Sequence, residues 1–270
     1  MPIDRLPDRA KSREPATPQL SLFAVPNIPL VQSGQDIAAL IAGGLANADM
    51  HLQDGDIVVV AQKIISKAEG RMLALADIVP SAKAKELAER SGKDPRIVEL
   101  ILQESKEVLR VRPGLIVVAH RLGLVLANAG IDQSNVSPAN EEQHVLLLPM
   151  DPDQSCETIR AELHQLCNAR VGVVISDSIG RAWRLGSIGT ALGVAGLAAV
   201  SDLRGRPDLF GRRMETSMVA VADEIAAAAS LLIGEADEGR PVVVVRGLTH
   251  LIGSGTGLDL LRPVDQDLFR

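Results

Sequence analysis

The chain has almost no aromatic residues: three Phe, one Trp and no Tyr occur among 270 residues. Proteins that bind single-stranded nucleic acid usually stack bases on aromatic side chains, so this scarcity argues against such a role. The formal net charge of -6 and the pI near 5.4 also argue against non-specific nucleic-acid binding. Hydrophobic residues make up 46% of the chain. We therefore expect a globular protein with a core of Val, Ile, Leu and Ala and with no nucleic-acid partner.

Cysteine is also scarce. Cys156 and Cys167 are the two cysteines, and the chain has neither a CxxC pair nor clustered histidines. This pattern excludes a disulfide framework and a cysteine-histidine zinc site. No apolar run reaches the roughly 18 residues of a membrane-spanning helix, and the N-terminus lacks the apolar core of a signal peptide. We therefore expect a cytoplasmic protein with reduced thiols and no membrane partner.

Residues 1–19 are rich in Pro, Arg, Asp and Lys without periodicity, which predicts a flexible N-terminal arm. The remaining residues, 20–270, alternate between apolar strand-like runs and helical stripes, and hairpins are mixed with helices. This pattern predicts an α+β fold with mixed β-sheets and flanking helices in two lobes. The Gly/Ala-rich residues 186–200 suit tight packing, for example across the twofold interface of an intimate homodimer.

The elements that matter below are expected at definite positions. Continuous apolar runs predict strands over 57–65, 115–120, 123–130, 146–149 and 241–247. Helical stripes predict helices over 35–48, 81–91, 95–106, 151–168 and 216–234.

Residues 171–196 are the first candidate for chemistry. An apolar run is followed by Asp177 and Ser178, where a buried strand would surface, and then by Arg181 and Arg184. A carboxylate and a hydroxyl are hard oxygen ligands for a divalent cation, and arginines bind anionic oxygens. Several glycines would let backbone N–H groups approach a phosphate. Taken alone, the stretch is more typical of a strand, a polar turn and a packed Gly/Ala segment.

Other polar chain segments supply matching groups. Asp132 and Asn135 could share an ion and a nucleotide, or they could form an Asx-turn that caps its own backbone. The loop 234–239 carries three carboxylates, and it could bind a cation and a ribose or be a solvated connection. Lys67 could act as a point charge on phosphate, or as a solvated lysine beside Glu69. Together these groups predict metal-assisted phosphoryl chemistry.

Longer blocks of the chain resemble a known family. The blocks are AQKIISKAEGR, LANAGIDQSN, VGVVISDSIGRAWRLGSIGTALGVAG, DLRGRPDLFGR, VAVADEIAAAASLLIGEADEGRPVVVVRG and DLLRP. In this order they are similar to the coenzyme F-420-0:L-glutamate ligase family, the gamma-glutamyl ligases of deazaflavin coenzyme biosynthesis. The resemblance runs from about Phe23 to Phe269, so we expect residues 20–270 to be a gamma-glutamyl ligase domain in its stand-alone form.

The resemblance implies a GTP-dependent ligase that adds L-glutamate to the terminal carboxyl of F-420-0, and then further glutamates through γ-linkages. It also implies two divalent cations, Mg²⁺ or Mn²⁺, help from a monovalent cation such as K⁺, and a homodimer. By the matching positions, Asp132 and Asp177 would bind one metal ion, whereas Ser178 and Glu235 would bind a second.

The resemblance further implies a set of GTP contacts. The family usually has a small hydroxyl residue where this chain has Gln62, and it more often has Gln at position 235. The implied contacts are Val25, Pro26, Asn27, Ile28, Gln62, Lys67, Asn135, Ile233, Gly234, Glu235, Ala236, Asp237, Glu238, Gly239 and Arg240.

The expected mechanism passes through an acyl phosphate. The γ-phosphoryl group of GTP would be transferred to the acceptor carboxylate, and the glutamate amine would then displace phosphate. Asp177, Lys67 and Arg181 are the expected catalytic residues, and Arg181, Arg184 or Arg204 would hold a substrate carboxylate or phosphodiester. Two alternatives stay open: another nucleotide-dependent carboxylate-amine ligase on the same scaffold, and a non-catalytic deazaflavin-binding protein.

Overall fold

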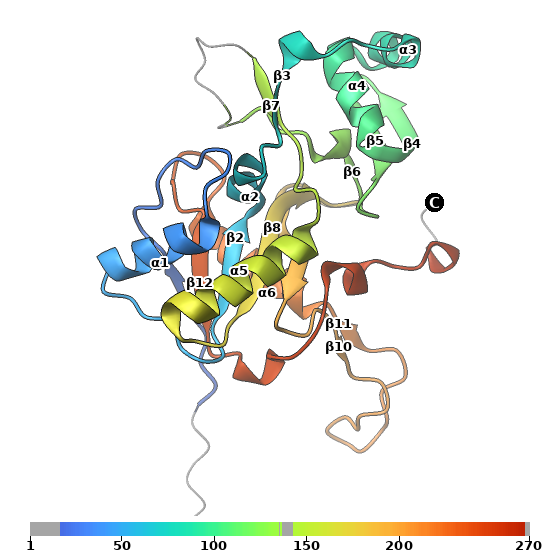
Figure 1. Ribbon diagram of the computed structural model, residues 1–270. Helices are drawn as coiled ribbons and strands as arrows, with labels where there is room; N and C mark the ends of the chain where they lie inside the picture. Colours follow the sequence, from blue (N-terminus) through green and yellow to red (C-terminus); the bar gives the residue numbers. More distant parts are fainter. Residues whose placement is uncertain (1–16, 135, 137–142, 268–270) are drawn as a thin grey trace, which may run out of the picture.

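The computed structural model describes residues 17–134, 136 and 143–267. Within them, five strands form the main sheet in the order β1-β12-β2-β8-β9 (Figure 1). β2 and β8 are parallel, and the other neighbours are antiparallel. The strands are β1 (Ser21–Ala24), β12 (Val242–Arg246), β2 (Ile57–Ala61), β8 (Gly172–Gly180) and β9 (Ser187–Ala195). The predicted mixed sheet is thus confirmed.

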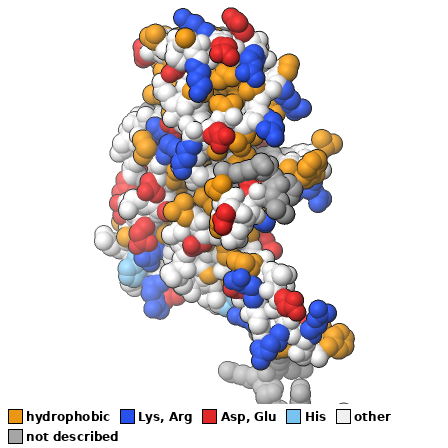
Figure 2. Space-filling view, turned by 90° about the vertical axis from the view of Figure 1, so that its right-hand side faces the viewer, with side chains coloured by type: hydrophobic (Ala, Val, Ile, Leu, Met, Phe, Trp, Pro, Cys, Tyr) orange, Lys and Arg blue, Asp and Glu red, His pale blue; other side chains and the backbone are white. Residues whose placement is uncertain are grey.

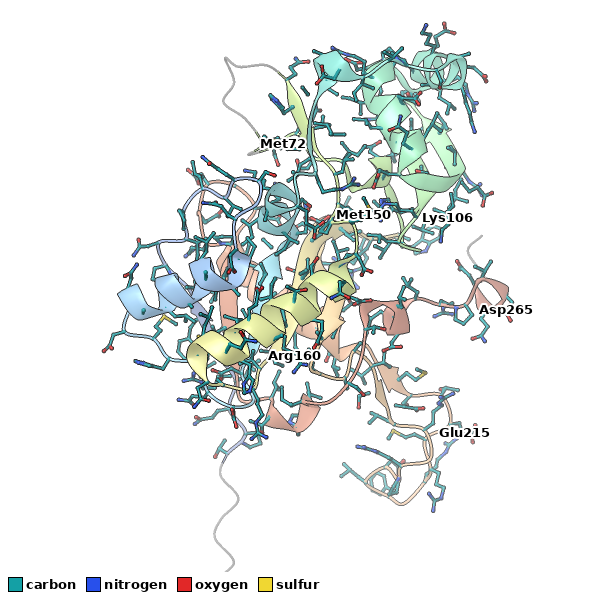
Figure 3. All side chains as sticks on the ribbon, in the orientation of Figure 1. Met72, Lys106, Met150, Arg160, Glu215 and Asp265 are labelled. Atoms are coloured by element: carbon teal, nitrogen blue, oxygen red, sulfur yellow. The ribbon has the colours of Figure 1, made fainter. Side chains whose placement is uncertain are left out.

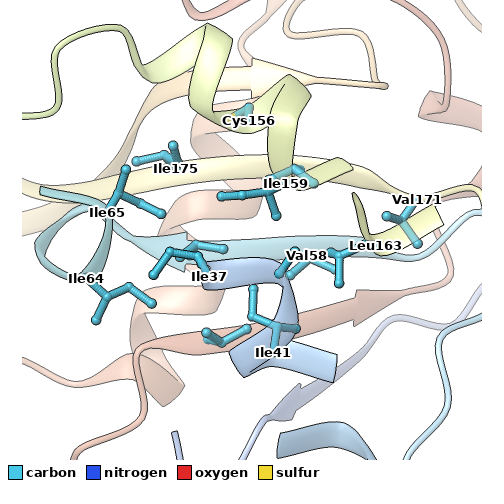
Figure 4. Close-up of a cluster of buried hydrophobic side chains, with 14 of the residues drawn as sticks. Ile37, Ile41, Val58, Ile64, Ile65, Cys156, Ile159, Leu163, Val171 and Ile175 are labelled. Atoms are coloured by element: carbon cyan, nitrogen blue, oxygen red, sulfur yellow. The ribbon is translucent and has the colours of Figure 1, made fainter. Parts of the chain in front are cut away.

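Helices cover both faces of this sheet. They are α1 (Ile37–Asn47), α5 (Pro152–Cys167) and α6 (Val221–Ile233). Because side chains alternate along a strand, Val58 and Val60 of β2 pack with α1 and α5, the side shown in Figure 4. Ile57 and Val59 pack with α6 on the other side. The sheet is therefore the middle layer of three, and its core is aliphatic, as expected.

A second lobe carries its own small sheet, β4-β5-β6, and two helices (Figure 1). Its elements are α3 (Ala82–Ser91), α4 (Pro95–Gln103), β4 (Ser105–Arg112), β5 (Leu115–His120) and β6 (Val125–Ala127). Leu87, Ile101 and Ile116 belong to its separate core cluster. The antiparallel pair β3 (Met72–Ala74) and β7 (His144–Leu146) leads into and out of this lobe. The predicted α+β fold with two lobes is confirmed.

Shorter elements complete the described chain. They are α2 (Gln62–Ala68), β10 (Ser201–Asp202), β11 (Met218–Val219) and the 3-10 helices η1 (Leu75–Asp77), η2 (Asn128–Gly130), η3 (Thr249–Leu251), η4 (Gly257–Leu260) and η5 (Val264–Gln266). The segment between β10 and β11 projects away from both lobes, and Glu215 marks it in Figure 3. Figure 2 shows acidic and basic side chains interspersed over one face of the molecule.

Several predicted boundaries are wrong. The helix expected over 95–106 ends at Gln103, and β4 begins at Ser105. The strand expected over 123–130 is limited to Val125–Ala127, and the strand expected over 146–149 is β7, which ends at Leu146.

The strand expected over 57–65 ends at Ala61, because residues 62–68 form α2. Ile64 and Ile65 of this helix are buried, and a short apolar run cannot distinguish a buried strand from a buried helical turn. The helix expected from residue 216 begins at Val221, because the preceding residues pair with β10.

The arm predicted over residues 1–19 lies mostly outside the described residues, which begin at residue 17. Its division from the domain therefore stays a prediction. In the described part of the chain, no helix is both long enough and apolar enough to span a membrane.

A buried carboxylate joins the two lobes. Glu104, at the end of α4, is 8% exposed. It binds Arg71 Nη2 at 2.7 Å and Arg121 Nε at 2.9 Å. Arg121 also donates to the carbonyl oxygen of Met150 at 2.6 Å, at the junction of the lobes (Figure 3). Burial acts to raise the pKa of Glu104, but the adjacent His120 and the guanidinium groups of Arg71 and Arg121 outweigh it and lower the pKa to about 2.

Candidate active site

The topology brings four chain segments to one edge of the main sheet. Because β12 is antiparallel to β1 and β2, and β2 is parallel to β8, the carboxyl ends of β1, β2 and β8 lie beside the amino end of β12. Two backbone hydrogen bonds close this edge, from Val25 N to Val242 O at 2.9 Å and from Ala61 N to Pro241 O at 2.8 Å. In α/β sheets, ligands typically bind beyond the carboxyl ends of the strands.

Asp177 and Ser178 lie in the second half of β8 and point to opposite faces of the sheet. Ser178 faces α6, and its Oγ donates to Glu235 Oε1 at 2.6 Å. Gly189 of β9, the partner of Ser178, lets α6 approach, because a Cβ at this position would collide with the carbonyl oxygen of Ala226. The close packing of α6 thus brings the loop that follows it to the end of β8.

Asp132 reaches the same edge from the second lobe. Its Oδ1 accepts from Ser134 N and Ser134 Oγ, both at 2.7 Å, which is the Asx-turn expected as an alternative. Its Oδ2 binds Lys63 Nζ at 2.7 Å. The preceding residues Asn128–Gly130 all have positive φ, including the buried Ala129 at 53°. This conformation is unfavourable for alanine, so the surrounding packing must fix the turn that delivers Asp132.

The carboxylate of Asp177 lies within electrostatic reach of Asp132 and Glu235. The pKa of Asp177 is raised to about 6, first because its carboxylate is buried and then because Asp132 and Glu235 carry nearby negative charges. The N–H of Ser178, 2.8 Å from Oδ1, and the ammonium of Lys63 act in the opposite direction. The structure therefore brings Asp132, Asp177, Ser178 and Glu235 together from segments far apart in the sequence.

Lys67 lies on α2, one turn beyond Lys63, so both ammonium groups are on the same side of the helix. Burial lowers the pKa of Lys67, the charge of Lys63 lowers it further, and Asp132 raises it. Glu69, the expected surface partner, instead accepts a hydrogen bond from Ser155 Oγ at 2.7 Å. A partly desolvated ammonium beside this edge is well suited to bind a phosphate.

The residues expected to contact GTP surround the same edge. The turn of Val25, Pro26, Asn27 and Ile28 packs on Gly44 of α1, where a Cβ would lie 2.9 to 3.1 Å from atoms of this turn. Asn27 has a positive φ of 56°. Gln62, by contrast, is buried. It is 2% exposed, and its Oε1 accepts a hydrogen bond from Ser66 Oγ at 2.9 Å.

The loop after α6 supplies most of the other expected contacts. Ile233 is the last residue of α6, and Gly234 follows with a φ of 80°. The carboxylate of Glu238 accepts from Ala236 N at 2.9 Å and shapes the turn. The loop residues Glu235, Ala236, Asp237, Glu238, Gly239 and Arg240 are exposed. Asn135 lies outside the described residues, so its expected contact stays a prediction.

The expected metal ligands lie at the same end of the sheet but do not form a complete metal site. Among residues 17–134, 136 and 143–267, no three His, Cys, Asp or Glu side chains are placed to hold a metal ion by themselves. Mg²⁺ is usually bound by one or two carboxylates, with water and substrate phosphates completing its shell. Asp132 with Asp177, and Ser178 with Glu235, could each contribute ligands to a partial site of this kind. Their oxygens suit Mg²⁺ or Mn²⁺, so the residues fit cations that bind together with a nucleotide.

The expected arginines are less closely tied to this cluster. Arg181 and Arg184 are exposed in the connection between β8 and β9. Arg204 forms an ion pair with Asp202 at 2.6 Å. The hydrogen bonds and ion pairs found in the described part of the chain do not join these arginines to Asp177, so their roles stay predictions.

Lys63 belongs to this cluster and was missed from the sequence. In a strand that continued beyond residue 65, Lys63 and Lys67 would be about 13 Å apart along the chain, with no reason to group them. The spacing of four residues between the two lysines, interpreted as helical, was the signal that could have revealed a shared face.

The raised pKa of Asp177 predicts a pH dependence of stability. The folded-state pKa of about 6 exceeds the ordinary value of 3.8, so the unfolded state releases this proton first. Between about pH 4 and pH 6 the folded state binds more protons, and the free energy of unfolding should fall as pH rises, by up to about 3 kcal/mol from this group. Above about pH 6 the loss is complete.

Urea unfolding of the wild type and Asp177→Asn in a chelator, across this pH range, tests the expectation. The variant cannot ionise at this position, so it should lack this component and become the more stable protein at neutral pH. Identical pH profiles for the two proteins would contradict the raised pKa.

Known proteins are similar to this chain over nearly all its length. Residues 26–247 match the family model of F420-0:Gamma-glutamyl ligase. The Coenzyme F420:L-glutamate ligase of Methanothermobacter thermautotrophicus is 49% identical over 253 residues, covering 93% of this chain and 99% of the relative. The proteins of the same name from Methanocaldococcus jannaschii and Archaeoglobus fulgidus are each 44% identical, covering 90% and 93% of this chain and 94% and 97% of the relatives. The chain therefore belongs to the F420-0:Gamma-glutamyl ligase family of enzymes.

Proposed function

We propose that this protein is a GTP-dependent ligase that joins L-glutamate to the terminal carboxyl group of F420-0 and then adds further γ-linked glutamates. Family membership and the names of the relatives support the substrates. The observation that carries the proposal is the meeting of Asp132, Asp177, Ser178 and Glu235 beside Lys67 at the carboxyl edge of the sheet.

The site residues divide into cation ligands and phosphate ligands. Asp132 and Asp177 would hold one divalent cation, Ser178 and Glu235 a second, with K⁺ as a further candidate ion. Bound Mg²⁺ or Mn²⁺ would neutralise charge on the triphosphate and on the phosphoryl group in transfer. Lys67 would add a fixed positive charge to the same phosphates.

The proposed reaction proceeds in two successive displacement steps. An oxygen of the acceptor carboxylate attacks the γ-phosphorus of GTP, the bond to the β-phosphate oxygen breaks, and GDP leaves. The glutamate amine then attacks the carbonyl carbon of the acyl phosphate, a C–N bond forms, the C–O bond to phosphate breaks, and the amine loses a proton. The chain holds the groups in line for these steps, which is the main protein contribution in phosphoryl transfer.

Arginines would orient the anionic substrates. A guanidinium binds a carboxylate or a phosphodiester through two parallel hydrogen bonds. Arg204 is already paired with Asp202, which favours Arg181 and Arg184 for this role. Their exposed connection directly follows the strand that carries Asp177 and Ser178.

We also propose that the protein is a homodimer. Trp183 and Leu185 are exposed on the connection between β8 and β9, and Leu209 and Phe210 are exposed on the segment that projects between β10 and β11. Large exposed apolar side chains often mark interaction surfaces. Light scattering of the purified protein should give the mass of two chains, and the mass of one chain would reject the proposal.

The function is tested with purified protein, GTP, F420-0, L-glutamate and Mg²⁺ or Mn²⁺. We expect phosphate release that requires all three substrates, and mass spectrometry should find products extended by one or more glutamyl residues. Turnover only with a different acceptor acid would indicate another carboxylate-amine ligase. Deazaflavin binding without phosphate release would indicate a non-catalytic binding protein.

A further inference from the structure

Lys63 makes the type of contacts expected of a bound cation. Its Nζ lies 2.7 Å from Asp132 Oδ2 and 2.8 Å from Ser134 Oγ, and the carbonyl oxygen of Ser134 is 3.5 Å away. A carboxylate, a hydroxyl and a carbonyl are also the oxygen ligands that a hard divalent cation prefers. The Lys63 ammonium therefore contacts oxygens that a metal ion bound at Asp132 would use.

The surroundings make this ion pair stronger than an ordinary surface pair. The side chains of Lys63 and Asp132 are 29% and 26% exposed, so solvent screens their attraction only in part. Lys63 also acts on Asp177 and on Lys67. Its charge thus acts on Asp132, Asp177 and Lys67 rather than on one carboxylate alone.

The charges of the side chains in this cluster limit which ions can bind there. Asp132, Asp177 and Glu235 carry three negative charges when ionised, opposed by the ammonium groups of Lys63 and Lys67. A divalent cation at Asp132 would displace the Lys63 ammonium and leave it beside a like charge. The repulsion is relieved when an anion such as a nucleotide triphosphate arrives, because its phosphates can take up the displaced ammonium.

We propose that Lys63 is a positioning residue that holds Asp132 in the metal-free protein and makes divalent cation and nucleotide bind cooperatively. The inference rests on the proposed cation site. Lys63 weakens the binding of the cation alone, and the nucleotide phosphates remove this penalty by accepting its ammonium. By linkage, the cation strengthens nucleotide binding by the same factor.

The test is a titration of the full-length protein with Mn²⁺, in which electron paramagnetic resonance measures free Mn²⁺ without and with a non-hydrolysable GTP analogue. Lys63→Met removes the charge and keeps the length of the side chain. We expect Lys63→Met to bind Mn²⁺ about tenfold more tightly than wild type without nucleotide, and to gain less affinity from the analogue. Lys63→Arg keeps the charge and should behave as wild type.

Lys85→Met, on the exposed face of α3, is the matched control and should not differ from wild type. Unchanged or weaker Mn²⁺ binding by Lys63→Met without nucleotide would overturn the inference. Asp177→Asn separates this failure from that of the site. If Asp177→Asn loses Mn²⁺ and Lys63→Met is unchanged, only the role of Lys63 is rejected. If Asp177→Asn binds Mn²⁺ as wild type does, the cation site itself is rejected, and this inference with it.

Discussion

Replacing Asp177 with Asn is expected to lower kcat by about three orders of magnitude while leaving the fold intact. The substitution keeps the size of the side chain but removes the charge that would be shared with a cation, and cation stabilisation of transferring phosphoryl groups amounts to several kcal/mol. Burial and the charges of Asp132 and Glu235 all raise the pKa of Asp177. Phosphate release from GTP with F420-0 and L-glutamate measures the effect.

Two observations make this result specific. Asp77→Asn, at an exposed aspartate in η1 of the second lobe, should retain wild-type turnover. The far-UV circular dichroism of Asp177→Asn should match that of wild type, and its Tm in a chelator should be no lower, because the variant loses a repelled carboxylate. Turnover within tenfold of wild type would reject a cation-binding role for Asp177.

The second large effect concerns stability. Glu104→Ala is expected to lower the free energy of unfolding by about 3 to 5 kcal/mol, because it leaves Arg71 and Arg121 without their buried counter-charge. The fully buried His120 also faces this carboxylate, with Nε2 at 3.5 Å. Since these partners belong to segments on both sides of the lobe junction, the variant should also loosen the contact between the lobes.

Urea unfolding at neutral pH measures this loss, and Glu107→Ala, at an exposed position of β4, should stay within about 0.5 kcal/mol of wild type. The pKa of Glu104 is about 2, below the ordinary 4.5, so its stabilising contribution is complete above about pH 4.5. The contribution should be lost as pH falls toward 2. A loss below about 1 kcal/mol in Glu104→Ala would show that the network does not hold the lobes.

Much of the candidate site could be predicted because a buried strand becomes polar only where it surfaces. The change from an apolar run to Asp177 and Ser178 marked where β8 leaves the buried core, although the strand itself continues to Gly180. The carboxylates of loop 234–239 were visible in the same way, between a helical stripe and an apolar run. Their convergence could only be hypothesised, since it depends on the strand order β12-β2-β8.

Other features could not be predicted because their partners are distant in the chain. Glu104 follows a helix as many surface acids do, and only the tertiary fold supplies the arginines that bury it. The position of Lys63 could not be predicted for a different reason. The apolar run 57–65 fits one continuous strand as well as a strand followed by a helix. The ion pair between Lys63 and Asp132 depends on both lobes being in place.

We propose that oxygens of Asp132, Asp177, Ser178 and Glu235 hold cations beneath the phosphates of a nucleotide. The most direct test is a crystal structure of the protein with Mn²⁺ and a non-hydrolysable GTP analogue, in which anomalous scattering locates the manganese. We expect two manganese peaks, one shared by Asp132 and Asp177 and one by Ser178 and Glu235, each also bound to phosphate oxygens. Manganese and triphosphate bound elsewhere, with these four side chains unliganded, would contradict the account.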